Sequence, residues 1–429
     1  MGTVTVLTAD ATNNLFLDTV VSGTVDGSGH LILTKQDAST VDCGSVKGDK
    51  GDTGAAGPSG GRPPASAIVV SSTFLNGGYS TDAASFMWAC DGTSDEVEIN
   101  AAIAAVATEG GGSVKLLGTG FSTSDSIVMK TGVKLHGEGL GTIIQAASGF
   151  GSGMIVLEDA TTHATIVSDL TLDGNSLAVH GFHYSQSGGQ VFSTPEPSTQ
   201  PDPVHKIHNV FICDTGSSTV AGYGMLMQGA NLRAGQYTNI RIQRASGCGV
   251  WINGSVDSHY ANLDVASSAS SGLAYSTSST APIGHGIYCS AGDNNMFTAC
   301  KTWYNRGAGF YNRGSRNGYA NCQAQDNYSC GFHMAWGKSS YVGCHADSNG
   351  SAAGDSGRLT SGFYVASELN RLEGCMSYDR GNSTQTHGVQ YTSGSTYCYV
   401  GVTTYANTAA STTGTLGTGS TSAVISSGT

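Results

Sequence analysis

One four-residue phrase recurs between Gly181 and Tyr391 and limits what this chain can fold into. The phrase is a glycine, an apolar residue, any residue and a second apolar residue. It opens at Gly181, Gly224, Gly249, Gly286, Gly309, Gly331, Gly362 and Gly388, and the copy ending at Asn312 breaks the rule at its last place. Because apolar residues alternate within a spaced repeat, the pattern predicts a β-solenoid, in which each turn lays a short strand on the previous one.

A second set of residues keeps step with these glycines. Ile240, Leu263, Cys300 and Cys322 each lie nine residues before a glycine, whereas Cys344 is one residue out of step. The three cysteines are 22 residues apart, which is the length of one predicted turn. We interpret all five as an interior ladder of stacked side chains, in which cysteine acts as a small buried hydrophobe.

The composition excludes several classes of protein. Of 429 residues, 62 are glycine and 12% are charged, which favours frequent turns over a long helical bundle. The net charge of −12 disfavours general binding to nucleic acid or to an anionic membrane. No apolar run reaches the roughly 18 residues of a membrane span. The first residues lack the basic and apolar regions of a secretory signal.

The cysteines predict neither a bound metal nor a disulfide framework. Their number, 11, is odd, and they form no CxxC pair and no Cys/His spacing of a zinc site. The sequence therefore predicts no cofactor, no metal and no disulfide.

Changes in pattern divide the chain into five predicted parts. These are a small N-terminal β-domain (1–46), a collagen-like connector (47–64), a join with a capping helix (65–112), a parallel β-helix (113–405) and a Ser/Thr/Gly-rich tip (406–429). The N-terminal domain is too small to hold a good core alone, so we expect it to pack against copies of itself. Loops that interrupt the repeat are expected near 185–206, 213–223, 276–285 and 351–361.

The connector has glycine at every third position. These glycines are Gly48, Gly51, Gly54, Gly57 and Gly60. A collagen triple helix needs this spacing because no side chain fits at the shared axis. A flexible glycine-rich linker is the alternative. The strict register favours the triple helix, and hence a homotrimer.

The predicted helix begins at a capping box formed by Thr93-Ser-Asp-Glu96 and ends before Gly110. Solenoids need a terminal cap over the first open turn. The helix is therefore expected to cover that end of the coil.

Residues 91–145 resemble a known family. Asp91-Gly-Thr-Ser-Asp95, Ile99-Asn-Ala-Ala-Ile103, Gly110-Gly-Gly-Ser-Val114 and Gly132-Val-Lys-Leu135 resemble the opening segment of pectate-lyase-like right-handed parallel β-helix proteins, which include phage tailspikes. One departure is Gly118-Thr-Gly-Phe121, where the family often has a Pro-x-Gly-Tyr turn. The resemblance implies an all-β, right-handed parallel β-helix with one capping helix.

The first 60 residues are similar to minor tail proteins of tailed phages that infect actinobacteria. The similarity lies in Gly29-His-Leu-Ile-Leu-Thr34 and Thr40-Val-Asp42, followed by the collagen triplets. It implies a virion component at the tail tip or baseplate, made in the host cytoplasm. The N-terminal domain would join tail proteins, and the distal part would bind host surface glycan. No nucleic acid partner and no membrane insertion are expected.

β-helix proteins of this family often cleave polysaccharide, so a depolymerase or lyase is the alternative function. The candidate catalytic residues are Asp257, Asp264, His285 and Asp293, and Asp326 and Asp347 lie 21 residues apart. Glycoside hydrolysis needs two carboxylates about 5–10 Å apart, which adjacent turns can supply. Aspartates also cap turns, and that interpretation is favoured for each. Gly284-His285-Gly286 resembles a polygalacturonase motif whose acid pair is missing here. The sequence therefore favours a binding protein over an enzyme.

Alternation predicts that the middle residue of each glycine phrase faces outward. These residues form a partly aromatic stripe that includes Trp251, Tyr288, Tyr311, His333 and Tyr364. Aromatic faces stack on sugar rings and also make protein contacts. The stripe is therefore expected to be either a trimer interface or a glycan-binding face.

Overall fold

The computed structural model describes most of the chain in two compact units, Met1–Pro63 and Pro64–Thr429. The described residues are 20–46, 65–73, 86–147, 150–186, 204–230, 232–269, 273–351, 359–381, 384–407, 412–415 and 417–426. The five collagen-like glycines and most of the proline-rich loop near 185–206 lie outside them.

The first unit is a three-stranded antiparallel sheet made of β1 (Val20–Val25), β2 (His30–Lys35) and β3 (Thr40–Ser45) in that order. The Asp26 carboxylate closes the first turn by accepting from the N–H groups of Ser28 and His30, both at 2.9 Å. None of the described residues of this unit is buried. A sheet this small needs a partner to cover its apolar side chains.

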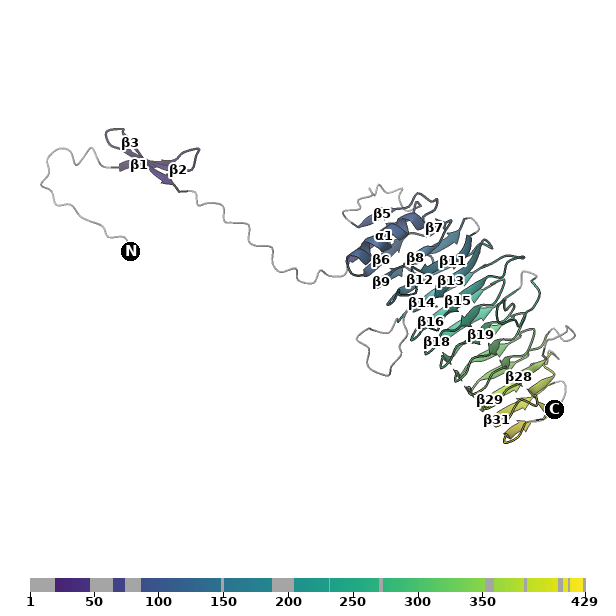
Figure 1. Cartoon of the computed structure of the whole chain (residues 1–429). Helices are drawn as coiled ribbons and strands as arrows, with labels where there is room; N and C mark the ends of the chain where they lie inside the picture. Colours follow the sequence, from purple (N-terminus) through teal and green to yellow (C-terminus); the bar gives the residue numbers. More distant parts are fainter. Residues whose placement is uncertain are drawn as a thin grey trace, which may run out of the picture. The chain divides into compact units, whose positions relative to one another are not determined.

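The second unit is a parallel β-helix, which confirms the predicted fold class (Figure 1). The larger of its sheets has 19 strands: β4 (Ala65–Val70), β5 (Met87–Ala89), β6 (Gly112–Leu117), β7 (Gly120–Thr123), β9 (Val133–His136), β10 (Ile143–Ala146), β12 (Ile166–Asp173), β14 (Lys206–Cys213), β16 (Gln236–Gln243), β18 (His259–Ala266), β20 (Met296–Thr298), β21 (Lys301–Trp303), β23 (Gly318–Ala320), β24 (Gln323–Gln325), β26 (Ser340–Val342), β27 (His345–Asp347), β29 (Arg371–Tyr378), β31 (Tyr399–Tyr405) and β33 (Thr421–Ser426). Since it includes β4 and β33, the coil extends beyond residues 113–405 at both ends.

The second sheet of this unit carries the glycine phrases. Its 11 strands are β8 (Ile127–Met129), β11 (Phe150–Leu157), β13 (Ala178–Ser185), β15 (Tyr223–Gln228), β17 (Val250–Asn253), β19 (Ile287–Ala291), β22 (Phe310–Asn312), β25 (Phe332–Met334), β28 (Ser361–Val365), β30 (His387–Tyr391) and β32 (Thr412–Thr413). The first apolar residue of each phrase pairs with that of the next, as in Ile287 with Phe310 and Phe310 with Phe332.

The phrase needs glycine because successive turns approach closely there. A Cβ on Gly309 would lie 2.8 Å from the carbonyl oxygen of Gly331, and a Cβ on Gly286 would lie 2.7 Å from that of Gly309. Atoms this close would clash, so a side chain at these positions would push two turns apart.

The residues of the interior ladder are buried beside a turn in the larger sheet. Cys322 and Cys344 are buried, and their Sγ atoms lie 3.5 Å from the carbonyl oxygens of Phe297 and Tyr319. Asn321, just before Cys322, has a φ of 53° and so turns the strand. The ladder also contains Ile240, Leu263 and Cys300, all buried.

The capping helix α1 (Glu96–Thr108) packs over the first turns of the coil (Figure 1). It ends before Gly110, as predicted. The predicted capping box is wrong because the helix begins at Glu96 and Asp95 makes no side-chain cap bond. The Asp95 carboxylate instead accepts from the N–H groups of Gly92 (2.8 Å) and Ser122 (2.7 Å), which ties the helix to the coil.

The turns between the two sheets form two corners of the coil. At the first corner the chain leaves the 11-stranded sheet, as between β22 and β23, and at the second corner it returns, as between β24 and β25. Ladders of buried amides hold both corners. At the second, the N–H of Asn305 donates to Oδ1 of Asn327 and that of Asn327 to Oδ1 of Asn349, both at 3.2 Å. At the first, the N–H of Asn295 donates to Oδ1 of Asn317 at 2.9 Å. These side chains satisfy backbone groups that no strand pairs.

Candidate functional site

A groove of about 460 Å³ opens at the first corner, across successive turns of the coil. The polar and aromatic residues that line it are Ser290, Asp293, Arg313, Ser315 and Trp336. Ser290 lies near the end of β19, and the others come from the turns that follow β19, β22 and β25, so stacking of the coil alone brings them together. Clefts with a few convergent polar groups and an aromatic face are typical of ligand sites.

Trp336 provides the aromatic face of the groove. It is 56% exposed, although its backbone N–H donates to the carbonyl oxygen of Asn312 at 3.2 Å. The main chain is therefore fixed to the previous turn while the indole stays open to solvent. An exposed ring on a backbone held in this way can stack on a flat apolar ligand face such as that of a sugar.

Arg313 provides a positive charge in the same groove. Among the described residues, no ion pair joins its guanidinium to a carboxylate. Its charge acts on the neighbouring ring of His333, whose pKa is lowered to about 3 by burial and, to a lesser extent, by Arg313. Arg313 thus adds a cation that no carboxylate of the described chain neutralises.

Asp293 is the carboxylate of the groove, and its charge is balanced. Oδ1 accepts from the N–H of Ser315 at 2.8 Å, and Oδ2 lies 3.4 Å from Nη2 of Arg316. Arg316 therefore offsets the charge of Asp293, and Arg313 remains the groove cation without a carboxylate partner among the described residues.

Asn312 is a buried residue next to the groove residue Arg313. It is buried at the place where other glycine phrases end in an apolar residue. Its Oδ1 accepts from the N–H of Gly314 at 3.1 Å, and its Nδ2 donates to Oγ of Ser339 at 3.0 Å. The side chain of Asn312 therefore holds the turn that carries Arg313, and the backbone carbonyl oxygen of Asn312 holds the backbone of Trp336. The phrase that ends in Asn312 instead of an apolar residue was the signal in the sequence for this site. The sequence analysis did not identify Arg313 or Trp336.

Two predicted catalytic candidates lie at or beside this groove. Asp293 lines it, and Asp257 lies one turn earlier, next to the lining residue Val256. The N–H of Asp257 donates to the carbonyl oxygen of Asp293 at 3.1 Å, and Oδ1 of Asp257 accepts from Nδ2 of Asn294 at 2.7 Å. The structure thus brings Asp257 and Asp293 to adjacent turns of one corner.

The other two candidates lie elsewhere. Asp264 is on the larger sheet, where it accepts from Nε1 of Trp303 at 2.5 Å and lies 3.9 Å from Nε of Arg241. His285 is fully buried, and burial lowers its pKa to about 3. Its Nδ1 accepts from the N–H of Ala308, and its Nε2 lies 3.2 Å from the carbonyl oxygen of Ser276. Both ring nitrogens are used, so His285 is a structural residue in this fold.

The aromatic stripe differs from its predicted exposure. Its rings point away from the interior, but Trp251 and Tyr311 are each 7% exposed and Tyr288 is fully buried. They form a second apolar cluster, onto which the partly buried Leu359 and Tyr364 pack. Loops cover this cluster, as where the Tyr288 hydroxyl donates to the carbonyl oxygen of Thr277 at 3.0 Å. The period-2 pattern gives the direction of a side chain but not what lies over it.

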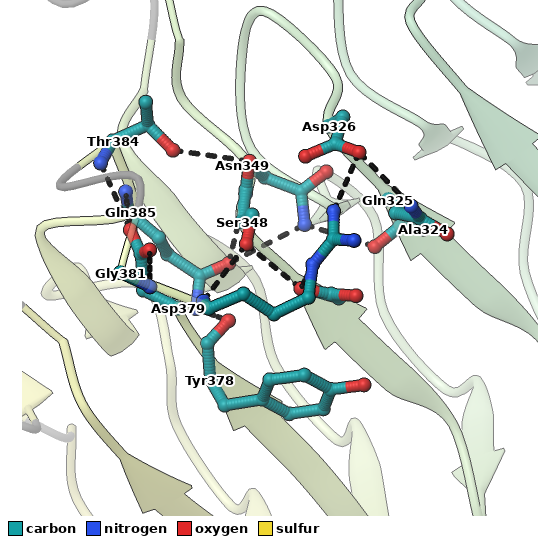
Figure 2. A network of polar contacts seen from close by, with 12 residues as sticks. Ala324, Gln325, Asp326, Ser348, Asn349, Tyr378, Asp379, Gly381, Thr384 and Gln385 are labelled. Atoms are coloured by element: carbon teal, nitrogen blue, oxygen red, sulfur yellow. Dashed lines mark hydrogen bonds and ion pairs between the residues drawn. The ribbon is translucent and has the colours of Figure 1, made fainter.

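A polar network at the second corner joins the other predicted carboxylate pair (Figure 2). Asp326 and Asp347 lie on adjacent turns, and the side chains are 9% and 4% exposed. Arg380 donates from Nη2 to Asp326 at 2.7 Å and from Nε to Asp347 at 2.9 Å. Its N–H also donates to Oγ of Ser348 at 3.0 Å. Both carboxylates are therefore engaged in ion pairs within the chain.

Two groups of side chains place ligand atoms within 4.8 Å of one another, as a metal would need: Cys90, Asp95 and Glu98, and Asp173, Cys213 and Asp214. Asp95 already accepts two backbone N–H groups, and Asp214 is paired with Arg244 at 2.6 Å.

Within the described residues, no helix has the length and apolarity to cross a membrane.

Comparisons with known proteins support the fold. No protein-family model matches the chain, and no curated protein sequence matches it. Among solved structures it is similar to the enzymatically active domain of tailspike protein 2 of bacteriophage CBA120, with a TM-score of 0.52 and 13% identity over 90% of this chain. That likeness spans 52% of the tailspike chain. The Dettilon tailspike protein matches with a TM-score of 0.45 and 14% identity, covering 83% of this chain and 68% of that one. The A-module of mannuronan C-5 epimerase AlgE4 from Azotobacter vinelandii matches with a TM-score of 0.49 and 18% identity, covering 84% and 100%.

Proposed function

We propose that this chain is a tail fibre or spike of a phage virion that binds carbohydrate on the host cell surface. The observation that carries the proposal is the groove at the first corner, with a half-exposed indole and polar groups on a stacked scaffold. The likeness of the β-helix to a phage tailspike supports the virion context. A rigid coil suits adhesion because its groove needs no reorganisation on binding.

A homotrimer follows from the same proposal. Val20, Val21 and Val25 on β1 are 48–58% exposed, and the three-stranded sheet has no core in its described residues. Three such sheets packed together would bury these side chains. The glycine triplets after the sheet would continue the trimer, and this N-terminal part would attach to tail proteins. Light scattering of the full chain in solution tests the stoichiometry, and a monomer at micromolar concentration would contradict it.

A depolymerase is the second candidate, and Asp293 and Asp257 favour it. They lie on adjacent turns at the groove, and strands of adjacent turns are about 4.8 Å apart. Two carboxylates about 5–10 Å apart are what a glycoside hydrolase needs. The pairing of Asp293 with Arg316 and Ser315 favours a structural role instead.

One assay separates binding from cleavage. Purified chain is incubated with glycan from actinobacterial cell envelopes, and retention on the protein is measured together with new reducing ends and unsaturated products. We expect retention without products, and Trp336→Ala should abolish the retention. Products released with multiple turnovers would replace adhesion by depolymerase activity. If intact chain retains no glycan and releases no product, both functions are wrong.

A further inference from the structure

We propose that the first-corner groove selects an anionic glycan, with Arg313 binding the acidic group and Trp336 stacking on the sugar ring. This inference rests on the proposed carbohydrate binding and adds the class of sugar. It concerns two residues that the repeat pattern does not require, since neither belongs to a glycine phrase.

The charge balance of the groove carries the first step. The chain as a whole is acidic, with 31 acidic against 19 basic residues. At the groove, Arg316 lies 3.4 Å from Asp293 and Arg313 remains without a carboxylate partner among the described residues. A guanidinium that is partly withdrawn from water binds carboxylate or phosphate oxygens more strongly than a fully solvated one does. The groove therefore favours a ligand that brings a negative charge.

The aromatic side of the groove carries the second step. Trp336 lies one turn after Arg313 in the coil, and both line the same groove. Adjacent turns are about 4.8 Å apart, which is close to the width of one sugar ring. A pyranose stacked on the indole would therefore place a ring substituent within reach of the guanidinium. A free inorganic anion would leave the indole without a partner.

Asn312 is the positioning residue for this pair. Its backbone carbonyl oxygen accepts from the N–H of Trp336, and its side chain accepts from the N–H of Gly314, beside Arg313. The apolar residue found elsewhere at this place could make the first contact but not the second. Asn312, which departs from the repeat, thus holds the turn of Arg313 beside that of Trp336.

Titration with three purified probes tests the inference: oligogalacturonate, a glycerol-phosphate-bearing teichoic acid fragment and neutral cellotetraose. Binding is followed by calorimetry on the full chain. We expect saturable binding of an anionic probe, weakened by about 0.5 M salt. Arg313→Gln should weaken it about tenfold or more, as expected for a lost charged hydrogen bond. Arg371→Gln, which removes an exposed arginine on β29, is the matched control and should change nothing. The tighter anionic probe identifies the acidic group as carboxylate or phosphate.

The outcomes separate this inference from the proposed function. If cellotetraose binds as tightly as the anionic probes and depends on Trp336, the groove binds glycans but does not select charge. Equal affinities of Arg313→Gln and Arg371→Gln would also overturn the role of Arg313. If no probe and no envelope glycan binds the intact chain, both the inference and the proposed function are wrong.

Discussion

The two corners of the coil contain the same residue types but differ in their burial and in their partners. At the second corner Arg380 lies between two carboxylates that are 9% and 4% exposed, and its backbone N–H donates to Ser348. At the first corner Asp293 is 42% exposed, and Arg313 has no carboxylate partner among the described residues. Residue identity alone does not separate structure from function here. Burial and partners do, because a charge that is satisfied inside the chain has little left for a ligand.

The largest expected effect is the loss of Arg380. Arg380→Met leaves two nearly buried carboxylates on adjacent turns without a counter-charge, so the free energy of unfolding should fall by about 3–5 kcal/mol. Arg313→Met, the matched change at the first corner, should cost less than about 0.5 kcal/mol because it breaks no ion pair of the described chain. Urea unfolding of both variants measures the difference.

A second set of variants sharpens this result. Adding Asp326→Asn and Asp347→Asn to Arg380→Met removes both uncompensated charges, so part of the lost stability should return. If Arg380→Met and Arg313→Met destabilise the chain equally, the two corners do not differ in the way described.

Two tryptophans extend the comparison from charge to apolar contact. Trp251 is 7% exposed under the loops, and its Nε1 donates to Oγ of Ser290 at 2.8 Å, whereas Trp336 is 56% exposed in the groove. Trp251→Ala should therefore cost about 3 kcal/mol of unfolding free energy. Trp336→Ala should change it by less than about 0.5 kcal/mol while removing glycan binding. Comparable losses of stability in both variants would mean that Trp336 is a packing residue.

Acid should act on the covered aromatic cluster through His285. Its pKa is lowered from 6.5 to about 3 by burial, and it packs against Tyr275, Tyr288 and Tyr311. Above pH 6.5 both folded and unfolded chains carry it neutral; below that pH only the unfolded chain takes up the proton. The contribution of neutral His285 to the free energy of unfolding is therefore complete above about pH 6.5 and is lower by about 2 kcal/mol at pH 5.

His285→Gln tests this effect, because glutamine keeps polar atoms at the site but cannot be protonated. The loss of unfolding free energy between pH 7 and pH 5 should be smaller in the variant by about 2 kcal/mol. An identical pH dependence in chain and variant would contradict the buried, neutral state of His285.

The sequence predicted the coil well because a solenoid repeats its physical constraints at every turn. The glycine of each phrase is fixed by a close backbone approach, and Cys322 and Cys344 by a buried column, so both recur at a constant spacing. The groove could not be read in the same way. Trp336 and Arg313 occur once, and what distinguishes them is that Trp336 stays exposed and that Arg313 has no carboxylate partner among the described residues. The alternation of apolar and polar residues likewise predicts that Trp251 points outward but does not predict the loops that bury it.

The smallest expected effect concerns Asp293, where binding and catalysis make opposite predictions. Asp293→Asn breaks an exposed ion pair with Arg316, so stability should change by less than about 1 kcal/mol. It also removes a negative charge beside Arg313, so affinity for an anionic glycan should rise about two- to threefold at low salt and lose that gain at high salt. Calorimetry at both salt concentrations measures this shift, with Asp264→Asn on the larger sheet as the control. A fall in affinity would mean that Asp293 itself binds the sugar. Loss of product release in a chain that cleaves glycan would make Asp293 a catalytic carboxylate.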